Sequence, residues 1–286
     1  HERFMWIHRL TGVLFAFAVY HAFFVTGSRV LQVPVLAFYL GLLSLTALGL
    51  FGYRYAFKSL KPRRRYKVSN VEDLNGAWEI SMSSTSRGID HVAGQFAFLT
   101  FTSSSLPQQT HPFTIASAPS EKDLRFVIKN LGDFTAKLGE LKVGDHVFVE
   151  GPYGTFNYAN MSRKRQVWVA GGIGVTPFLS MARSFEQSDG VEAHLFYSVA
   201  DETQAYGSEE LTRLSAGLKG SLGFTLHDSS KQGFISVGQI AKQVQDLAEC
   251  EVLLCGPKGM MRALEEQFIA VGVSKKHIQY EEFSLL

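Results

Sequence analysis

Two long apolar runs open the chain, and their lengths are typical of helices that cross a bilayer. The runs extend from Ile7 to Val25 and from Val33 to Phe57, each near the roughly 20 residues that span a hydrocarbon core of about 30 Å. A short polar turn, Thr26 to Arg29, separates them. The pattern predicts a membrane helical hairpin over residues 1–60, although a hairpin buried inside a large soluble protein would give the same pattern.

Positive charges flank both ends of this hairpin. Arg3 and Arg9 lie at its start, and a run rich in lysine and arginine, Lys58 to Lys67, follows it. The cytoplasmic flanks of membrane helices carry such an excess of positive charge. We therefore expect a multi-pass membrane protein in contact with membrane lipid, with everything after Lys67 in the cytoplasm.

After the hairpin, the pattern changes to short alternating or apolar runs separated by turn residues. This spacing predicts a small antiparallel barrel of the Greek-key type over residues 61–160, interrupted by one helix from Phe134 to Lys142. The expected strands are Ala77–Ser84, Gln95–Phe101, Phe113–Pro119, Leu124–Leu131 and His146–Gly151.

From Gln166 onward, strands alternate with helices, and glycine turns follow several strands. This alternation predicts a Rossmann-like parallel sheet with helices on both faces over residues 161–286. The polar segment Asn157 to Lys164 is the expected joint. The expected strands are Val167–Ala170, Glu192–Val199, Gly223–His227, Glu251–Cys255 and His277–Phe283, and the expected helices are Thr176–Glu186, Glu209–Ala216, Val237–Val244 and Pro257–Val271.

Composition excludes several classes of protein. The formal charge of +2 is too small to indicate a nucleic-acid partner. Two cysteines, Cys250 and Cys255, cannot form a disulfide framework or supply the four thiolates of an iron–sulfur cluster. The chain begins at His1 without a charged n-region or a cleavage site, so no signal peptide is expected and the sequence has the character of a fragment.

Two segments of the predicted barrel suit a flat, phosphorylated cofactor. His111 to Ser117 places an aromatic ring beside a hydroxyl at a strand, which can cover a ring and bond its edge, although Phe on a strand is more often a core residue. Lys129 to Thr135 ends a strand and opens a helix, where free backbone N–H groups favour a phosphate. Asp133 in that segment could equally be an ordinary helix cap.

Two glycine-containing turns follow strands of the predicted parallel sheet. The turn from Gly171 to Pro177 leads from a strand into a helix, and its glycines allow close approach of backbone to a pyrophosphate, although the pattern is not the strict G-x-G-x-x-G. Cys255 to Pro257 repeats the arrangement after a later strand, at the sheet edge where open α/β sheets bind ligands. A thiol at Cys255 could lie beside a nicotinamide or be a buried structural residue.

Taken in order, these segments resemble the ferredoxin-reductase superfamily from about Val68 to Leu286. Their forms are most similar to the NADPH oxidase and ferric reductase branch, bacterial-type NADPH oxidases above all, in which His rather than Arg precedes the Pro-aromatic-hydroxyl unit. The resemblance implies an FAD-binding barrel and an NAD(P)-binding domain. The motifs that carry it are His-Pro-Phe-Thr, Gly-Asp-Phe-Thr, Gly-Pro-Tyr-Gly (Gly151 to Gly154), Gly-Gly-Ile-Gly-Val-Thr-Pro and Cys-Gly-Pro.

The resemblance also implies roles for individual residues. Phe113 would pack on the isoalloxazine, and the expected catalytic residues are Thr114 near the reactive flavin nitrogen, Cys255 near the nicotinamide and Phe283 on the flavin face. Phe283 could equally be a core residue of the last strand. The remaining expected cofactor contacts are His111, Pro112, Lys129, Gly132, Phe134 and Thr135 for FAD, and Gly171, Gly172, Gly174, Thr176, Pro177, Ser198, Gly256 and Pro257 for the nicotinamide nucleotide.

One departure from the family concerns the nucleotide. Members that prefer NADPH often carry Arg near the position of Ser198 to Asp201, whereas Asp201 would repel a 2′-phosphate. NADPH is the expected cofactor, with NADH as the alternative.

Two histidines in the first apolar run indicate a metal. His8 and His21 lie 13 residues apart, or about 20 Å along a helix, but about 140° apart around it. Ionisable residues within a bilayer are usually functional, and neutral imidazole is a common haem ligand. We therefore expect haem b at both histidines. The segment resembles a haem-ligating helix of ferric-reductase-like membrane domains, in which the second axial histidines come from earlier helices.

These expectations combine into three functional hypotheses. The first is a transmembrane oxidoreductase: hydride passes from NAD(P)H to FAD, which converts it to single electrons, and membrane haems deliver these to dioxygen, giving superoxide, or to ferric iron. The second is an electron-delivery module for a separate protein partner, with the hairpin as an anchor. The third is a flavin-binding scaffold without turnover.

Overall fold

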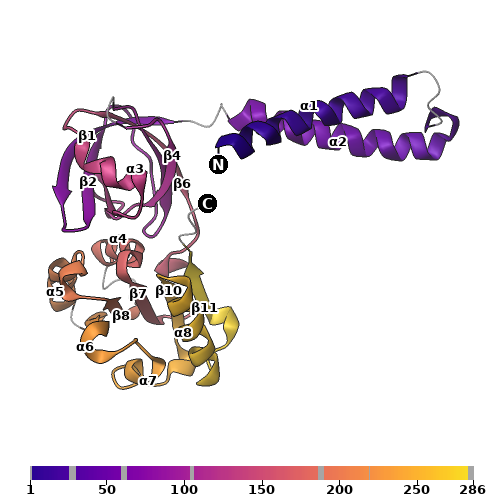
Figure 1. The fold of residues 1–286 in the computed structure, drawn as a ribbon. Coiled ribbons are helices and arrows are strands. Elements are labelled where there is room, and N and C mark those ends of the chain that lie inside the picture. The colour runs from indigo at the N-terminus through magenta and orange to yellow at the C-terminus, as the bar shows by residue number, and fades with distance from the viewer. Residues whose placement is uncertain are drawn as a thin grey trace. The chain divides into compact units, whose positions relative to one another are not determined.

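The structure is a computed structural model that describes residues 2–25, 30–58, 63–103, 106–185, 190–218 and 220–282, with side chains described at 10–53 and from 63 onward within these ranges. The chain divides into two compact units, His1–Pro62 and Arg63–Leu286. The first contains two helices and the second contains two sheets (Figure 1).

The first unit is a helical hairpin. Helix α1 (Glu2–Phe24) and helix α2 (Pro34–Lys58) are joined through the short 3-10 helix η1 (Val30–Gln32). A Cβ atom at Gly12 would overlap the ring of Phe51. The glycine therefore lets the two helices approach closely.

Apolar side chains cover the outside of this hairpin. Phe17 is 67% exposed and Leu45 is 73% exposed. The segment Pro34–Tyr53 is long and apolar enough to cross a membrane, whereas Leu10–Phe24 is apolar but shorter. The predicted hairpin is present as two helices, and its insertion into a membrane stays a prediction.

The second unit begins with a six-stranded antiparallel sheet in the order β4-β3-β6-β1-β2-β5. Alternate residues face inward, as in β3, where Ala97, Leu99 and Phe101 are buried. Beyond the end of β4, the backbone N–H of Ala116 donates to the carbonyl of Arg125 on β5 at 2.8 Å, which links the two ends of the sheet order. The strands are β1 (Arg64–Asp73), β2 (Ala77–Ser84), β3 (Phe96–Phe101), β4 (Thr110–Thr114), β5 (Leu124–Lys129) and β6 (His146–Tyr153).

The predicted antiparallel barrel is confirmed, with three corrections. Strand β1 was not expected, because its basic start hides the inward alternation of Tyr66 and Val68. Strand β4 ends at Thr114 rather than at Pro119, since the following residues leave the sheet. The expected helix from Phe134 is only α3 (Asp133–Ala136) and the 3-10 turn η2 (Lys137–Glu140).

A five-stranded parallel sheet follows, in the order β11-β10-β7-β8-β9. Trp168 on β7 packs with α4 and α5 on one face, while its neighbours Val167 and Val169 pack with α7 and α8 on the other. The expected parallel sheet with helices on both faces is confirmed. The elements are β7 (Arg165–Gly171), β8 (Glu192–Val199), β9 (Leu222–Asp228), β10 (Glu251–Cys255), β11 (Ile278–Glu281), α4 (Thr176–Ser184), α5 (Ser208–Gly217), α6 (Ser229–Gln232), α7 (Val237–Ile240) and α8 (Lys258–Ala270).

One expectation for this part needs correction. The predicted helix Val237 to Val244 is shorter, because only Val237–Ile240 is helical and turns follow. The expected joint, Asn157 to Lys164, packs on the parallel sheet, since Tyr158 is buried against Trp168 with ring centroids 5.8 Å apart. The two sheets of the second unit also share one core, in which Ala116 and Val127 join Trp168.

Short 3-10 helices complete the second unit. They are η3 (Tyr158–Asn160), η4 (Gly172–Val175), η6 (Glu202–Gln204), η7 (Leu247–Glu249) and η8 (Lys275–His277).

Candidate active site

The end of β4 carries a buried hydroxyl without a protein partner. Thr114 is 6% exposed, and its Oγ1 has no hydrogen-bond partner among the described residues. Leaving a buried polar group unpaired costs about 1–3 kcal/mol, so the site suits a ligand with a polar edge. Phe113 lies beside it and is half-buried. This pair fits the predicted contact with a flavin ring, which FAD would supply.

His111, two residues before Phe113, lies over an aromatic ring of the barrel. Its ring centroid is 4.0 Å from that of Phe134, and its Nε2 is 3.2 Å from Oε1 of Gln109. Burial lowers the pKa of His111, so the imidazole is neutral at neutral pH. Phe134 is only 8% exposed and belongs to the barrel core, which gives its side chain a packing role. Pro112 is exposed on the same strand.

The segment between β5 and α3 forms a tight turn with open space beside it. The Oγ1 atom of Thr135 accepts hydrogen bonds from the N–H groups of Leu131 and Gly132, at 2.9 and 3.0 Å. Among the described residues, no atom lies within 4 Å of the place where a Cβ of Gly132 would stand. Lys129 extends away from this turn, and its Nζ donates to Oε1 of Gln204 at 3.3 Å.

The two glycine-containing turns of the parallel sheet touch each other. Gly171 ends β7, and Cys255 ends the adjacent strand β10. A Cβ at Gly174 would lie 2.6 Å from the carbonyl carbon of Cys255, and a Cβ at Gly256 would lie 2.9 Å from Cα of Gly171. The strand order reverses between β7 and β10, and open α/β sheets bind ligands at such a point.

The exposed part of this edge presents backbone rather than side chains. Gly172 has φ +54°, and no atom occupies the space of its missing Cβ. Thr176 starts α4 and is buried, with its hydroxyl donating to the carbonyl of Ile173 at 3.1 Å. Pro177 is buried in the first turn and Pro257 precedes α8. The glycine turn before α4 therefore lets a pyrophosphate approach the backbone closely.

The structure does not bring the Cys255 thiol to the surface. Cys255 is fully buried in the shared core, and burial, with a contribution from Glu281, raises its pKa well above the ordinary thiol value. The thiol is therefore protonated, and the backbone of Cys255 rather than its sulfur contacts the glycine turn. The expected contact of this thiol with a nicotinamide stays a prediction. Ser198 is buried near the end of β8, and Phe283 lies outside the described residues.

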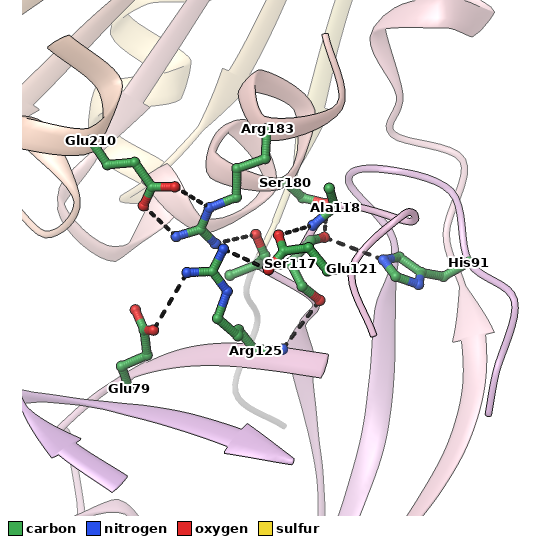
Figure 2. Close-up of polar contacts among 10 residues, drawn as sticks. Glu79, His91, Ser117, Ala118, Glu121, Arg125, Ser180, Arg183 and Glu210 are labelled. Carbon is green, nitrogen blue, oxygen red and sulfur yellow. Dashed lines mark hydrogen bonds and ion pairs between the residues drawn. The ribbon is translucent and has the colours of Figure 1, made fainter. Parts of the chain in front are cut away.

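An arginine that the motifs did not indicate ties the two sheets together next to this site (Figure 2). On α4, the guanidinium of Arg183 donates to both carboxylate oxygens of Glu210, at 2.8 and 2.6 Å. Its Nη1 donates to the carbonyl of Ala116 at 2.5 Å. The Arg183 side chain is only 5% exposed. Ala116 follows Thr114 by two residues, so this clamp holds the segment directly behind the candidate flavin contact.

The neighbouring residue, Ser117, has three further polar contacts. Its carbonyl accepts from Oγ of Ser180 on α4 at 2.7 Å and lies 3.2 Å from Nε2 of His91. Its hydroxyl accepts from the N–H of Arg125 at 3.1 Å. Figure 2 shows these groups gathered around the Ser117 turn. No sequence signal marks them, because an arginine or serine on a helix is ordinarily solvated and its burial depends on the second sheet.

The two predicted haem ligands lie on one helix. His21 is exposed on α1, and α1 also contains His8. The described part of α2 contains no histidine, and no group of three or more metal-binding side chains occurs among the residues that the structure describes. The predicted haem stays unsupported.

Both sheets of the second unit match known domain families. Residues 62–157 match the FAD-binding domain family, and residues 168–266 match the oxidoreductase NAD-binding domain family. The reductase component of propane 2-monooxygenase from Mycolicibacterium goodii is 28% identical over 210 residues, which are 68% of this chain and 60% of the relative. The electron transfer component of toluate 1,2-dioxygenase from Pseudomonas putida is 28% identical over 76% of this chain and 66% of the relative. The chain thus spans about 60–66% of the length of these relatives.

Solved structures share the fold of the second unit. The FAD/NAD-binding domain of nitric oxide dioxygenase from Vibrio cholerae matches this fold with a TM-score of 0.66 at 22% identity. The match covers 77% of this chain and 98% of that domain. These comparisons support an FAD-binding domain followed by an NAD-binding domain in the second unit. They support the expected FAD and NAD(P) domains of the ferredoxin-reductase superfamily, but not the narrower assignment to NADPH oxidases, and they do not support haem.

Proposed function

We propose that this chain, whose FAD-binding and NAD-binding domains belong to the ferredoxin-reductase superfamily, is a membrane-anchored electron-delivery module. It accepts hydride from NAD(P)H and passes single electrons to a separate protein partner. The observation that carries the proposal is the buried, unpartnered hydroxyl of Thr114 in the same unit as the touching turns at Gly174 and Cys255. One site suits a flavin edge and the other suits a dinucleotide.

The roles of the chain's own groups follow from their positions. When bound, FAD supplies the conversion between a two-electron hydride transfer and one-electron steps. Thr114 donates a hydrogen bond to the flavin edge, and Phe113 covers its ring. The backbone at Gly172 and the start of α4 hold the pyrophosphate of the nicotinamide nucleotide.

The kind of partner is inferred from the relatives. The two relatives are components of propane 2-monooxygenase and toluate 1,2-dioxygenase systems, and their names describe a reductase and an electron transfer component. This supports an oxygenase or another one-electron redox protein as the acceptor. The exposed apolar surface of α1 and α2 supports membrane lipid as the second partner, with the FAD and NAD(P) domains in the cytoplasm.

A second candidate function is the transmembrane oxidase or ferric reductase, with dioxygen or ferric iron as the acceptor. The observation in its favour is the pair His8 and His21 within one apolar helix, since ionisable residues in a membrane are usually functional. The relatives support the electron-delivery module better, because the two described above are reductase and electron transfer components.

The test measures both acceptor and haem in the FAD-loaded full chain, reconstituted in lipid nanodiscs. If the chain is an electron-delivery module, each NAD(P)H that it oxidises should reduce two molecules of a one-electron acceptor, ferricyanide or cytochrome c. The protein should show no haem absorbance. The rate of acceptor reduction should be the same in His8→Ala and His21→Ala as in the wild type. Stoichiometric haem that is lost in these variants, together with superoxide formation, would favour the oxidase instead.

A further inference from the structure

The carboxyl ends of β8 and β9 carry acidic side chains beside the nucleotide turn. Asp201 follows β8 by two residues, and Asp228 ends β9, paired in register with Val199 of β8. The match to the NAD-binding domain family includes both residues. In dinucleotide-binding sheets, an acidic residue after the second strand bonds the ribose 2′-hydroxyl of NAD, whereas an arginine there accommodates the 2′-phosphate of NADP. Strand β8 is the second strand of this sheet in chain order, after β7.

The two lysines described at this edge already bond protein groups, and Lys129 of β5 donates to Oε1 of Gln204 at 3.3 Å. Lys231 lies 2.9 Å from Glu202 and 3.1 Å from Asp228. In residues 198–207 and 226–233, the charged side chains are Asp201, Glu202, Asp228 and Lys231. With the ammonium of Lys129, which reaches Gln204 of this edge, three carboxylates and two ammonium groups leave a net charge of −1. These segments contain no arginine. A 2′-phosphate would meet net negative charge with no guanidinium to bind it.

Both aspartates are held in place by hydrogen bonds from their own turns. The carboxylate of Asp201 accepts from the N–H of Thr203 at 2.7 Å. The carboxylate of Asp228 accepts from the N–H and the hydroxyl of Ser230, at 2.9 and 2.6 Å. These hydrogen bonds lower the pKa of both carboxyls, which are therefore ionised at neutral pH.

We propose that this chain selects NADH over NADPH, because Asp201 can bond the two ribose hydroxyls of NADH while the acidic edge formed by Asp201, Glu202 and Asp228 repels the 2′-phosphate of NADPH. The inference rests on the proposed function, since it concerns the nucleotide that reduces the flavin. Selection acts on binding of the nucleotide and not on the hydride step, because the 2′ position is remote from the nicotinamide.

The first experiment compares the two nucleotides on the FAD-loaded full chain by anaerobic stopped-flow absorbance. At subsaturating nucleotide, NADH is expected to reduce the flavin at least tenfold faster than NADPH. The ratio of the NADH rate to the NADPH rate is expected to fall as ionic strength rises, because salt screens exposed charges over a Debye length of about 10 Å at 0.1 M. Equal rates, or faster reduction by NADPH, would overturn the inference while leaving the proposed function intact. Failure of both nucleotides despite bound FAD would overturn both.

The second experiment changes the charge at the acidic edge. Asp201→Arg combined with Glu202→Gln is expected to raise the NADPH-to-NADH ratio of kcat/KM at least tenfold, through a lower KM for NADPH and a higher KM for NADH. The matched control is Asp246→Asn, an exposed aspartate before η7, which should leave the ratio unchanged. A ratio that stays within twofold of the wild-type value in the double variant would contradict the inference.

Discussion

Thr114 combines near-complete burial with a hydroxyl that no described protein group satisfies. Natural proteins rarely leave such a group unpaired, so its partner is expected in the bound cofactor. Thr114→Val removes the hydroxyl but keeps the shape of the side chain. We expect flavin reduction to slow about five- to tenfold, the equivalent of one lost hydrogen bond, with FAD still bound.

Stopped-flow rates and flavin content of the purified variant check this prediction. The control is Thr110→Val on the same strand, because Thr110 is exposed. A Thr114→Val variant that reduces its flavin at the wild-type rate would show that the hydroxyl has no part in the reaction.

Gly174 is the residue at which the two turns of the parallel sheet come closest. A methyl group there would stand 2.6 Å from the carbonyl carbon of Cys255, and backbone cannot move aside as a flexible side chain can. We expect Gly174→Ala to lower the free energy of unfolding by about 1–3 kcal/mol, as overpacking does, and to weaken nucleotide binding.

Chemical denaturation measures the free energy of unfolding of Gly174→Ala. Titration with nucleotide measures its nucleotide binding. Gly259→Ala is the matched control, because Gly259 lies in α8 with open space around its Cβ position. Alanine is favoured over glycine in helices by roughly 0.5–1 kcal/mol, so this control should be neutral or stabilising. An equally stable Gly174→Ala protein would contradict the proposed contact between the turns.

At the scale of elements, the clamp between α4, α5 and the segment after β4 holds the two sheets of the second unit together. Arg183→Met leaves the carboxylate of Glu210 and the carbonyl of Ala116 without their donor. Because the Glu210 side chain is 28% exposed, we expect a loss of about 1–3 kcal/mol, below the full cost of breaking a buried pair. Flavin reduction should slow as well, since the clamp positions the backbone behind Thr114.

The same clamp predicts a pH dependence. The hydrogen bond from Arg183 lowers the pKa of Glu210, so the folded state holds the proton less tightly than the unfolded chain. The stabilisation is therefore complete above the ordinary glutamate pKa and is lost as pH falls through the lowered value. Thermal unfolding measured between neutral and acidic pH should show that the wild type loses stability as pH falls. The Glu210→Gln variant should lose less stability over the same range. Lys276→Met, which changes an exposed lysine of η8, is the control. Equal pH profiles of the wild type and Glu210→Gln would contradict the proposed role of the clamp.

Much of the element order follows from local patterns in the sequence. The bounds of β2, β8 and β10 agree with the alternating or apolar runs that predicted them, because a strand buried on one or both faces shows its period directly. Strand β1 escaped prediction because its polar residues alternate with only Tyr66 and Val68 as buried anchors.

The candidate site could be predicted only where a short sequence motif specifies a local backbone conformation or carries a reactive group. Glycine turns and the hydroxyl of Thr114 could be found in this way. The Arg183 clamp could not, because it joins groups far apart in the chain and depends on how the two sheets meet. The sequence left two alternatives open for the Cys255 thiol, and its burial depends likewise on the core that both sheets share.

In the whole molecule, a unit with FAD-binding and NAD-binding domains follows a hairpin that exposes apolar side chains. Leu42 is 54% exposed and Leu45 is 73% exposed, near the middle of α2. Leu42→Lys with Leu45→Lys is expected to prevent membrane insertion, because a lysine at the centre of a spanning helix costs about 2.5–3.5 kcal/mol. Flavin reduction by nucleotide should persist in the detergent-solubilised protein.

Carbonate extraction of membranes checks the hairpin prediction. The wild type should stay with the membrane pellet and the double variant should be released. The control is Leu42→Ala with Leu45→Ala, which keeps the helix apolar and should stay with the pellet. Release of the wild type itself would contradict a membrane anchor.

Every proposed role depends on one step, the direct transfer of hydride from a nicotinamide nucleotide to FAD bound at Thr114. Anaerobic stopped-flow reduction of the FAD-loaded full chain tests it most directly, with NADH or NADPH carrying either hydrogen or deuterium at the transferred position. The account predicts rapid loss of the flavin's visible absorbance with at least one nucleotide, and a slower rate with the deuterated form. Bound FAD that neither nucleotide reduces would contradict the account and leave the chain as a flavin-binding protein without turnover.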